Sequence, residues 1–133
     1  MNECTVDDNI ALGELTNLEK LQLDEYSIDS LDLLKNLTSL KSLTIQGAEF
    51  ADLQALKDLT NLEELVLYGN RIKDISALSK LENLKILKLG GNLIENVETL
   101  TNLKNLTELS LRDNSIKNVQ VLEKLAGTDI DLE

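Results

Sequence analysis

The chain has 133 residues, of which 42% are hydrophobic and 2% aromatic, and its formal net charge at pH 7 is −11. This length predicts one domain, and the negative charge argues against nucleic acid and anionic membranes as partners. No apolar run long enough for a membrane span occurs, and the N-terminus lacks an apolar segment typical of a signal peptide. The sequence as given therefore predicts a cytoplasmic protein, or a surface protein if targeting segments lie outside it.

The first part of the chain is strongly acidic. Residues 1–34 contain nine acids and one base, Lys20, whereas residues 35–133 contain fifteen acids and twelve bases. Two interpretations stay open: a solvated cap that keeps the protein soluble, or an acidic end that attracts a basic partner. The single cysteine, Cys4, excludes an internal disulfide and is typical of a reducing compartment. Cys4 lies 22 residues, or one repeat, before Tyr26. It therefore falls at the turn position that such repeats usually give to Asn or Cys, and we expect it to have a structural role.

Five copies of the pattern Leu-x-x-Leu-x-Leu then follow at a constant spacing of 22 residues, with Ile45 in the last place of the second copy. They open at Leu18, Leu40, Leu62, Leu84 and Leu106. The alternation predicts a short strand with one buried face, and stacking of the copies predicts a parallel sheet. The second half of each copy, such as Ile75 to Leu81, is long enough only for short α or 3₁₀ turns.

An asparagine follows the strand in the last three copies, at Asn70, Asn92 and Asn114. Asparagine can bond backbone groups where the chain turns off a strand, so we expect a ladder of hydrogen bonds from copy to copy. Tyr26 and Ala48 occupy this position in the first two copies. The ladder should therefore be weaker toward the N-terminus.

Both ends depart from the repeat. Val6, Leu12 and Leu15 fall in register with later apolar positions, so residues 1–17 predict a half-repeat cap whose strand half would precede Met1. Residues 128–133 alternate apolar and acidic side chains, which predicts a final edge strand whose carboxylates discourage further pairing. We therefore expect one domain with a cap at 1–17, five repeats at 18–127 and a second cap at 128–133.

The segment Leu59-Thr60-Asn61-Leu62-Glu63-Glu64-Leu65, followed by Asn70-Arg71-Ile72-Lys73-Asp74-Ile75, resembles the 22-residue leucine-rich repeats of bacterial internalins. The leucine-rich regulatory subunit of protein phosphatase 1 has the same class of repeat. The resemblance covers about residues 12–126. It implies an α/β leucine-rich repeat solenoid, with a curved parallel sheet on the concave face and short α or 3₁₀ turns on the convex face. It also implies protein recognition through the concave strand face.

The outward-pointing strand positions should lie on that concave face, because the leucines point into the core. Val66, Tyr68 and Ile86 fall there on adjacent strands and predict one apolar patch, flanked by Lys88 and Arg112. Tyrosine and arginine around an apolar centre are typical of a binding hot spot, although β-branched and aromatic residues also favour strands for structural reasons. The predicted partner-binding residues are Val66, Tyr68, Ile86, Lys88, Ser110, Arg112, Glu64, Gln46 and Thr44.

Catalysis has little basis in this sequence. It contains no histidine, which removes the commonest general base and the usual activation of a serine or cysteine nucleophile. With one cysteine and no histidine a zinc site is not expected, and no spacing typical of a calcium loop occurs. No catalytic, cofactor-binding or metal-binding residue is therefore predicted.

These observations predict a monomeric, non-enzymatic interaction module for a protein partner, and the acidic charge favours a basic one. Two alternatives stay open. One is a stoichiometric regulator or inhibitor of an enzyme or toxin, comparable to a phosphatase subunit or an immunity protein. The other is a repeat fragment of a bacterial surface adhesin. A neighbouring toxin gene would favour the first, and a longer reading frame upstream of Met1 would favour the second.

Overall fold

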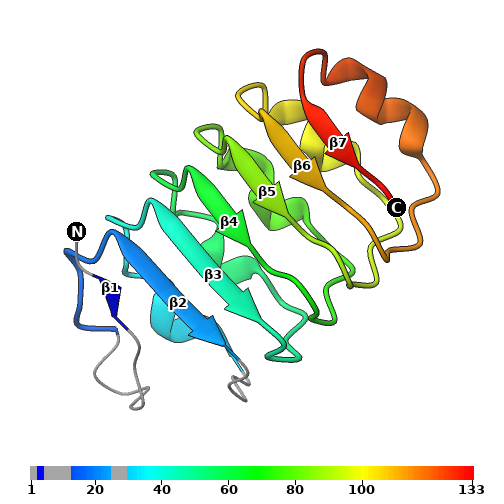
Figure 1. Cartoon of the computed structure of the whole chain (residues 1–133). Coiled ribbons are helices and arrows are strands. Elements are labelled where there is room, and N and C mark those ends of the chain that lie inside the picture. The colour runs from blue at the N-terminus through cyan, green and yellow to red at the C-terminus, as the bar shows by residue number, and fades with distance from the viewer. Residues whose placement is uncertain (1–2, 5–12, 25–29) are drawn as a thin grey trace.

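Within the residues described, seven parallel strands form one sheet in which sequence order is also spatial order (Figure 1). The computed structural model describes residues 3–4, 13–24 and 30–133. The strands are β1 (Glu3–Cys4), β2 (Lys20–Asp24), β3 (Ser42–Gln46), β4 (Glu64–Val66), β5 (Ile86–Lys88), β6 (Glu108–Ser110) and β7 (Asp129–Asp131). They are short because each copy of the repeat alternates apolar and polar residues over only a few positions before it turns.

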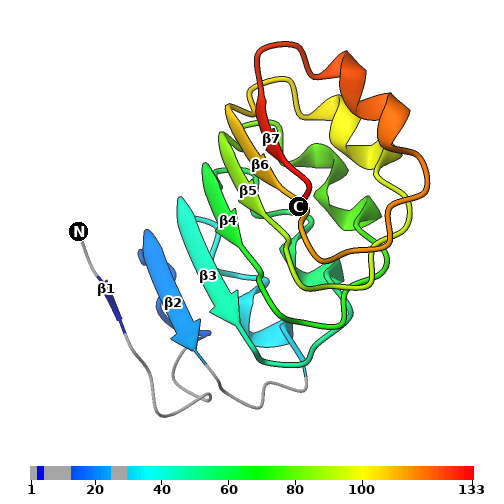
Figure 2. The same cartoon turned by 45° about the vertical axis from the view of Figure 1, so that its right-hand side comes forward.

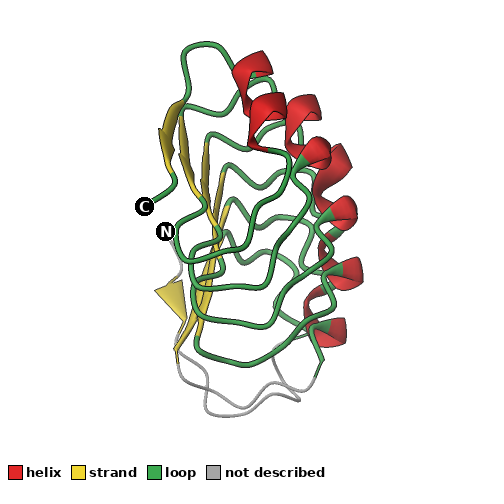
Figure 3. Ribbon diagram, turned by 90° about the vertical axis from the view of Figure 1, so that its right-hand side faces the viewer, coloured by secondary structure: helices red, strands yellow, loops and turns green. Residues whose placement is uncertain are grey.

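Short helical turns form a second layer on the opposite side from the sheet, as Figures 2 and 3 show. In the described part of the chain they are the 3₁₀ helices η1 (Asp32–Leu34), η2 (Gln54–Leu56), η3 (Ser76–Lys80), η4 (Glu98–Asn102) and η5 (Val119–Lys124). This curved parallel sheet with short turns on its convex side confirms the predicted fold class.

A polar side chain starts each of the first four helical turns. Ser30, Asp52, Asp74 and Asn96 each accept a hydrogen bond from the backbone N–H two residues later. Such bonds favour a tight turn at the point where the chain enters the helix. In the third repeat, the hydrogen bonds from Ser76 lower the pKa of the Asp74 carboxyl below its usual value.

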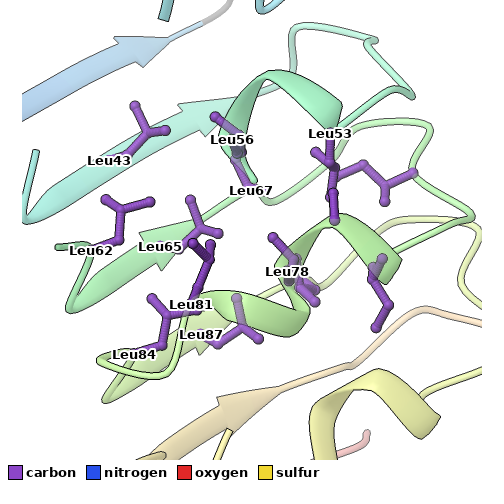
Figure 4. Packing of buried hydrophobic residues seen from close by; sticks show 14 of the residues in the cluster. Leu43, Leu53, Leu56, Leu62, Leu65, Leu67, Leu78, Leu81, Leu84 and Leu87 are labelled. Atoms are coloured by element: carbon purple, nitrogen blue, oxygen red, sulfur yellow. The ribbon is translucent and has the colours of Figure 1, made fainter. Parts of the chain in front are cut away.

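The leucines fill the space between the two layers. Figure 4 shows Leu43, Leu65 and Leu87 extending from adjacent strands into the same interior as Leu56 and Leu78 of the helical layer. All five side chains are fully buried. Because each repeat contributes one slice of this continuous core, its apolar face is covered by the slices on either side rather than by the repeat itself.

The strand register follows the 22-residue period through the middle of the sheet. Lys20, Ser42, Glu64, Ile86 and Glu108 occupy equivalent places on β2 to β6. Toward the C-terminus the step shortens, because Glu108 pairs with Asp129 and the facing pair Ser110 and Asp131 is 21 residues apart. The sheet therefore tolerates a change in repeat length at this end.

The prediction for the N-terminal strand was wrong. We expected no strand before Lys20, yet Glu3 pairs with Lys20 and Cys4 with Leu21. Cys4 therefore belongs to a strand and does not occupy the turn position. The 22-residue register does not extend to this end, since Glu3 and Lys20 are 17 residues apart (20 − 3). Their pairing gives backbone groups at the edge of β2 partners in the sheet. The expected half-repeat residues Val6 and Leu12 and the substituted position Tyr26 lie outside the described residues.

The predicted asparagine ladder is confirmed. Asn70 and Asn92 are the buried polar residues of the described chain. The Asn70 Nδ2 donates to the Ile45 carbonyl of the preceding repeat at 3.0 Å and to the Leu67 carbonyl of its own repeat at 3.1 Å. Its Oδ1 accepts the Ala48 N–H at 3.0 Å, so Ala48 takes part only through its backbone.

Two further ladders, which the sequence analysis did not predict, run along the exposed edge before the strands. Asn61, Asn83 and Asn105 each donate to a backbone carbonyl of the preceding repeat. Beside them, Lys41 pairs with Glu19 at 3.2 Å and Lys85 with Glu63 at 2.7 Å. The hydrogen bond and charge of Lys85 lower the pKa of the Glu63 carboxyl. These ion pairs are exposed, so each contributes little to the stability of the fold.

Candidate functional site

The outward side chains of the sheet form two rows that the strand pairing defines directly. The first contains Glu64, Ile86, Glu108 and Asp129 on β4 to β7. The second contains Thr44, Val66, Lys88, Ser110 and Asp131 on β3 to β7. Gln46, Tyr68, Gly90 and Arg112 follow two positions later in each repeat. All nine predicted partner-binding residues therefore lie on or directly beside this surface, which we call the strand face.

Six of these nine residues surround one hollow of about 430 Å³ on the strand face, which we call the strand-face hollow. They are Gln46, Val66, Tyr68, Lys88, Ser110 and Arg112. Thr44, Glu64 and Ile86 lie on the same face but do not line this hollow. Val66 and Ile86 stand in different rows. Of the three residues expected to form one apolar patch, Tyr68 and Val66 line the hollow together with charged residues, and Ile86 does not line it.

Three carboxylates that the sequence analysis left out of the site also line this hollow: Glu108, Asp129 and Asp131. Glu108 occupies an outward strand position, which was the signal that could have identified it. The two aspartates were interpreted only as protection of the sheet edge. The strand pairing instead places them in line with Glu108 and Ser110 of the neighbouring strand.

Tyr68 lies across the backbone of the next repeat. A Cβ atom built on Gly90 would come within 2.8 Å of the Tyr68 Cε2 and 3.0 Å of the Arg112 Cγ. One built on Gly91 would lie 3.5 Å from the Tyr68 Cζ. The ring therefore occupies space that a side chain at position 90 would fill, and it remains 43% exposed. Gly90 therefore leaves room for the Tyr68 ring on the strand face.

Gly91 is also needed for its backbone conformation. Its φ is +66°, and Gly47, Gly69 and Asp113 in the equivalent places have φ values of +63°, +70° and +55°. Glycine adopts this left-handed region without steric cost, and aspartate tolerates it better than most residues. β3 to β6 therefore end in the same turn, and after β4, β5 and β6 this turn is followed immediately by the asparagine of the ladder.

The two bases of the strand-face hollow are already paired. The Lys88 Nζ lies 2.9 Å from the Glu108 Oε1, and the Arg112 Nε lies 3.5 Å from the Asp131 Oδ2. Arg112 also donates to the backbone carbonyl of Glu133 at 2.6 Å. In contrast, the Asp129 carboxylate has neither a hydrogen bond nor an ion pair with any described residue. The hollow therefore presents a tyrosine ring beside excess negative charge.

Gly90→Ala is expected to move the Tyr68 ring without unfolding the protein. The new Cβ would overlap the ring edge, and a side chain can rotate where a backbone could not. We expect the free energy of unfolding to change by less than about 1 kcal/mol, because an exposed ring can find another rotamer. NMR spectra of ¹³C-labelled tyrosine would show a displaced Tyr68 signal. An unchanged Tyr68 signal would contradict the observed position of the ring.

Two other hollows lie beside the turns that follow the strands, and the sequence analysis did not predict them. Their volumes are about 490 and 530 Å³, and they share Lys73, Asp74 and Leu93. Leu93 is 47% exposed, in a position where Glu49, Arg71 and Ser115 stand in neighbouring repeats. The apolar side chain is the only signal of this surface in the sequence.

The described residues contain no group of three or more Cys, Asp or Glu side chains arranged to hold a metal ion. None of their helices is long and apolar enough to cross a membrane. The strand face presents an aromatic ring, small polar groups and charges of both signs.

Comparison with known proteins identifies the repeat. The model of the protein family described as "Leucine Rich repeats (2 copies)" matches residues 60–102. No curated protein sequence matches the chain. A solved structure of internalin C2 from Listeria monocytogenes str. 4b F2365 is similar, with 28% identity over 95% of this chain and a TM-score of 0.79. An internalin (inlF) from the same strain has 26% identity over 95% of this chain and a TM-score of 0.74.

The chain spans 66% and 51% of the lengths of these two structures. The leucine-rich repeat ectodomain of a receptor kinase from Arabidopsis thaliana is also similar, with 25% identity, coverage of 85% of this chain and 67% of the other, and a TM-score of 0.70. Such folds are generally non-enzymatic interaction modules, which supports a general protein-binding role. The chain is thus a leucine-rich repeat protein with internalin-like repeats.

Proposed function

We propose that this chain binds a protein partner through the strand face, with Tyr68 at the centre of the contact. The observation that carries this proposal is an exposed tyrosine ring beside a hollow on the face where short polar and charged side chains also converge. Large aromatic side chains next to a recess are favoured as binding anchors, because they bury much area with few rotatable bonds.

The composition of the rest of the strand face is consistent with a polar rim. Small uncharged groups cover much of β3, where Ser42, Thr44 and Gln46 point outward. Val66, which lines the hollow on the strand face, and Ile86, which lies in the neighbouring row, are both partly exposed, with charged residues beside them. An interface with an apolar centre and a polar border excludes water from its anchor residues while remaining soluble when free.

Affinity capture from a lysate of the source cells tests this proposal with three baits: wild type, Tyr68→Ala and Val119→Ala. Val119 belongs to η5 on the opposite layer and is 42% exposed, nearly the same as Tyr68. If Tyr68 is an anchor, its removal should weaken partner binding by about 2 kcal/mol, or roughly thirtyfold in Kd. Val119→Ala should capture the partner as wild type does.

Equal capture by the wild-type and Tyr68→Ala baits would refute the strand-face site, provided that both unfold at the same temperature. The nature of the captured protein distinguishes the narrower functions. An enzyme or toxin whose activity falls in proportion to added chain supports a stoichiometric regulator. If no bait captures a partner from the source cells, a partner captured instead from extracellular or host-cell protein supports a fragment of a surface adhesin.

A further inference from the structure

We infer that a second hollow on the strand face binds a neutral pyranose sugar, which stacks on the Tyr68 ring and forms hydrogen bonds with Gln46 and Asp24. This hollow has a volume of about 460 Å³ and is lined by Asp24, Gln46, Gly47, Tyr68 and Gly69. We call it the glycine hollow. Its volume is typical of small-ligand sites. It goes beyond the proposed function, because its ligand is a sugar and because Asp24, Gly47 and Gly69 do not line the strand-face hollow.

The strand pairing brings these side chains within reach of one ligand. Asp24 of β2 pairs directly with Gln46 of β3. Tyr68 follows β4 at the equivalent place one strand further, because Thr44 pairs with Val66 two positions earlier. Adjacent strands lie roughly 4.8 Å apart, so the backbone of Gln46 is next to that of Tyr68, and the backbone of Asp24 is about 10 Å from it. One sugar ring with its hydroxyl groups bridges the side chains across this distance.

The floor of the glycine hollow is bare backbone. A Cβ atom built on Gly47 would meet no described residue beyond its chain neighbours within 4 Å, and one built on Gly69 would approach only the backbone of Gly47. The Tyr68 ring lies over Gly90 instead, so it leaves this floor uncovered. The N–H groups of Gly47 and Gly69 already donate to the carbonyls of Tyr68 and Gly90. The floor thus provides room, and hydrogen bonds must come from the side chains around it.

Those side chains have hydrogen-bonding capacity to spare. The Gln46 amide makes no hydrogen bond with any described residue, so its donors and its acceptor oxygen are available. The Asp24 carboxylate accepts a hydrogen bond from Gln22 at 2.8 Å, which leaves lone pairs for a further donor. Sugar hydroxyl groups both donate and accept, so one ring matches an amide and a carboxylate together. The less polar face of the ring then packs on the exposed Tyr68 side chain.

The surrounding surface favours a neutral ligand with several hydroxyl groups. Gln22, Ser42 and Thr44, which point outward on β2 and β3, are uncharged hydrogen-bonding groups, whereas acids and bases occupy most outward positions of β5 to β7. An anion would be repelled by Asp24 and by the net charge of −11. The indole ring of a tryptophan offers a single N–H, which cannot satisfy both Gln46 and Asp24. A pyranose supplies enough donors and acceptors for both.

Titration of the intact ¹⁵N-labelled chain with methyl glycosides tests the site. The probes are methyl β-D-glucopyranoside, methyl β-D-galactopyranoside and methyl α-D-mannopyranoside. At least one of them should shift the backbone amide signals of Gly47 and Gly69 and the side-chain amide signal of Gln46 in a saturable way. The signal of Gly127, a glycine with positive φ outside the hollow, should not move. The absence of a saturable shift with all three glycosides overturns the inference.

Tetrahydropyran is the control ligand, because it has the ring of a pyranose without the hydroxyl groups. It should cause no saturable shift, since only the stacking contact remains to it. Shifts equal to those caused by the glycosides would remove Gln46 and Asp24 from the contact and overturn the inference.

Matched variants test the position of the sugar. Gly47→Asn places a side chain on the floor, and asparagine tolerates the left-handed conformation that Asp113 adopts in the equivalent place. Gly127→Asn makes the same change at φ +85°, away from the hollow. Gly47→Asn should abolish the saturable shift of Gly69, and Gly127→Asn should leave it unchanged. Equal effects of the two variants would overturn the site.

Gln46→Ala keeps the test valid if Gly47→Asn fails to fold, because Gln46 is exposed and makes no hydrogen bond with the described chain. It should raise the Kd for the glycoside about fivefold, through the loss of hydrogen bonds to the sugar. An unchanged Kd would contradict the predicted contact.

The source of the sugar and the proposed function are tested separately. If free glycoside displaces a captured protein and enzymatic deglycosylation of that protein prevents its capture, the sugar belongs to a glycoprotein partner. Binding to a purified polysaccharide without a captured protein instead identifies a free glycan, and both results support the site. Capture that depends on Tyr68 while no glycoside binds retains the proposed function and refutes the sugar site. Glycoside binding together with equal capture by the wild-type and Tyr68→Ala baits does the reverse.

Discussion

Asn92→Ala is expected to lower the free energy of unfolding by about 3 kcal/mol. The Asn92 Nδ2 donates to the carbonyls of Leu67 at 2.9 Å and Leu89 at 2.9 Å, and its Oδ1 accepts the Ile72 N–H at 3.1 Å. The side chain is 5% exposed, so alanine would leave several backbone groups without a partner and away from water. Urea unfolding followed by circular dichroism measures the loss.

Asn105→Ala provides the matched control for this prediction. Asn105 also donates from its Nδ2 to the preceding repeat, at 2.8 Å from the Glu82 carbonyl, but it does so at the exposed edge. Water can replace this bond, so we expect a loss below about 1 kcal/mol. If the two variants were equally destabilised, burial would not be the reason for the strength of the inner ladder.

Leu87→Ala should have the largest effect, lowering the free energy of unfolding by about 4 kcal/mol. Leu87 is fully buried on β5 and stands between Leu65 and Leu109 of the adjacent strands. Repeats on both sides hold these neighbours in place, so the cavity left by the missing methyl groups cannot easily collapse. Chemical denaturation of the purified variant gives the measurement.

Leu125→Ala tests whether this cost depends on position along the solenoid. Leu125 is 6% exposed and follows η5 in the last repeat, where packing is available mainly from one side. We expect a loss of about 2 kcal/mol, because terminal repeats can relax and fray. Hydrogen exchange should then increase around β7 but not around β4. A cost as large as that of Leu87→Ala would argue against this nearest-neighbour account.

The repeating part of the structure could be predicted because it depends on local periodicity. Leucine spacing defines a buried strand face in every copy, and the residue after the turn can be recognised as a ladder asparagine. The N-terminal strand could not be predicted in this way. Glu3 and Cys4 lack the leucine pattern, and their pairing with Lys20 and Leu21 is set by the open edge of β2 rather than by the repeat.

The candidate site was predicted only as a list of outward positions. Val66 and Tyr68 come together with Lys88 around one hollow, but Ile86 falls in the row of Glu64 and Glu108. Sequence alone identifies the face on which a side chain lies. It does not show which neighbour a long side chain leans toward, because that depends on free space across several strands.

By itself, the amino-acid sequence determined the 22-residue period, the parallel sheet and the strand face, since these follow from which residues must leave water. The tertiary structure decided the details of the surface. It placed Tyr68 over Gly90, paired Lys88 with Glu108, and brought Asp129 to the same hollow. These contacts join residues of different repeats through side-chain shape and charge, which the hydrophobic period does not encode.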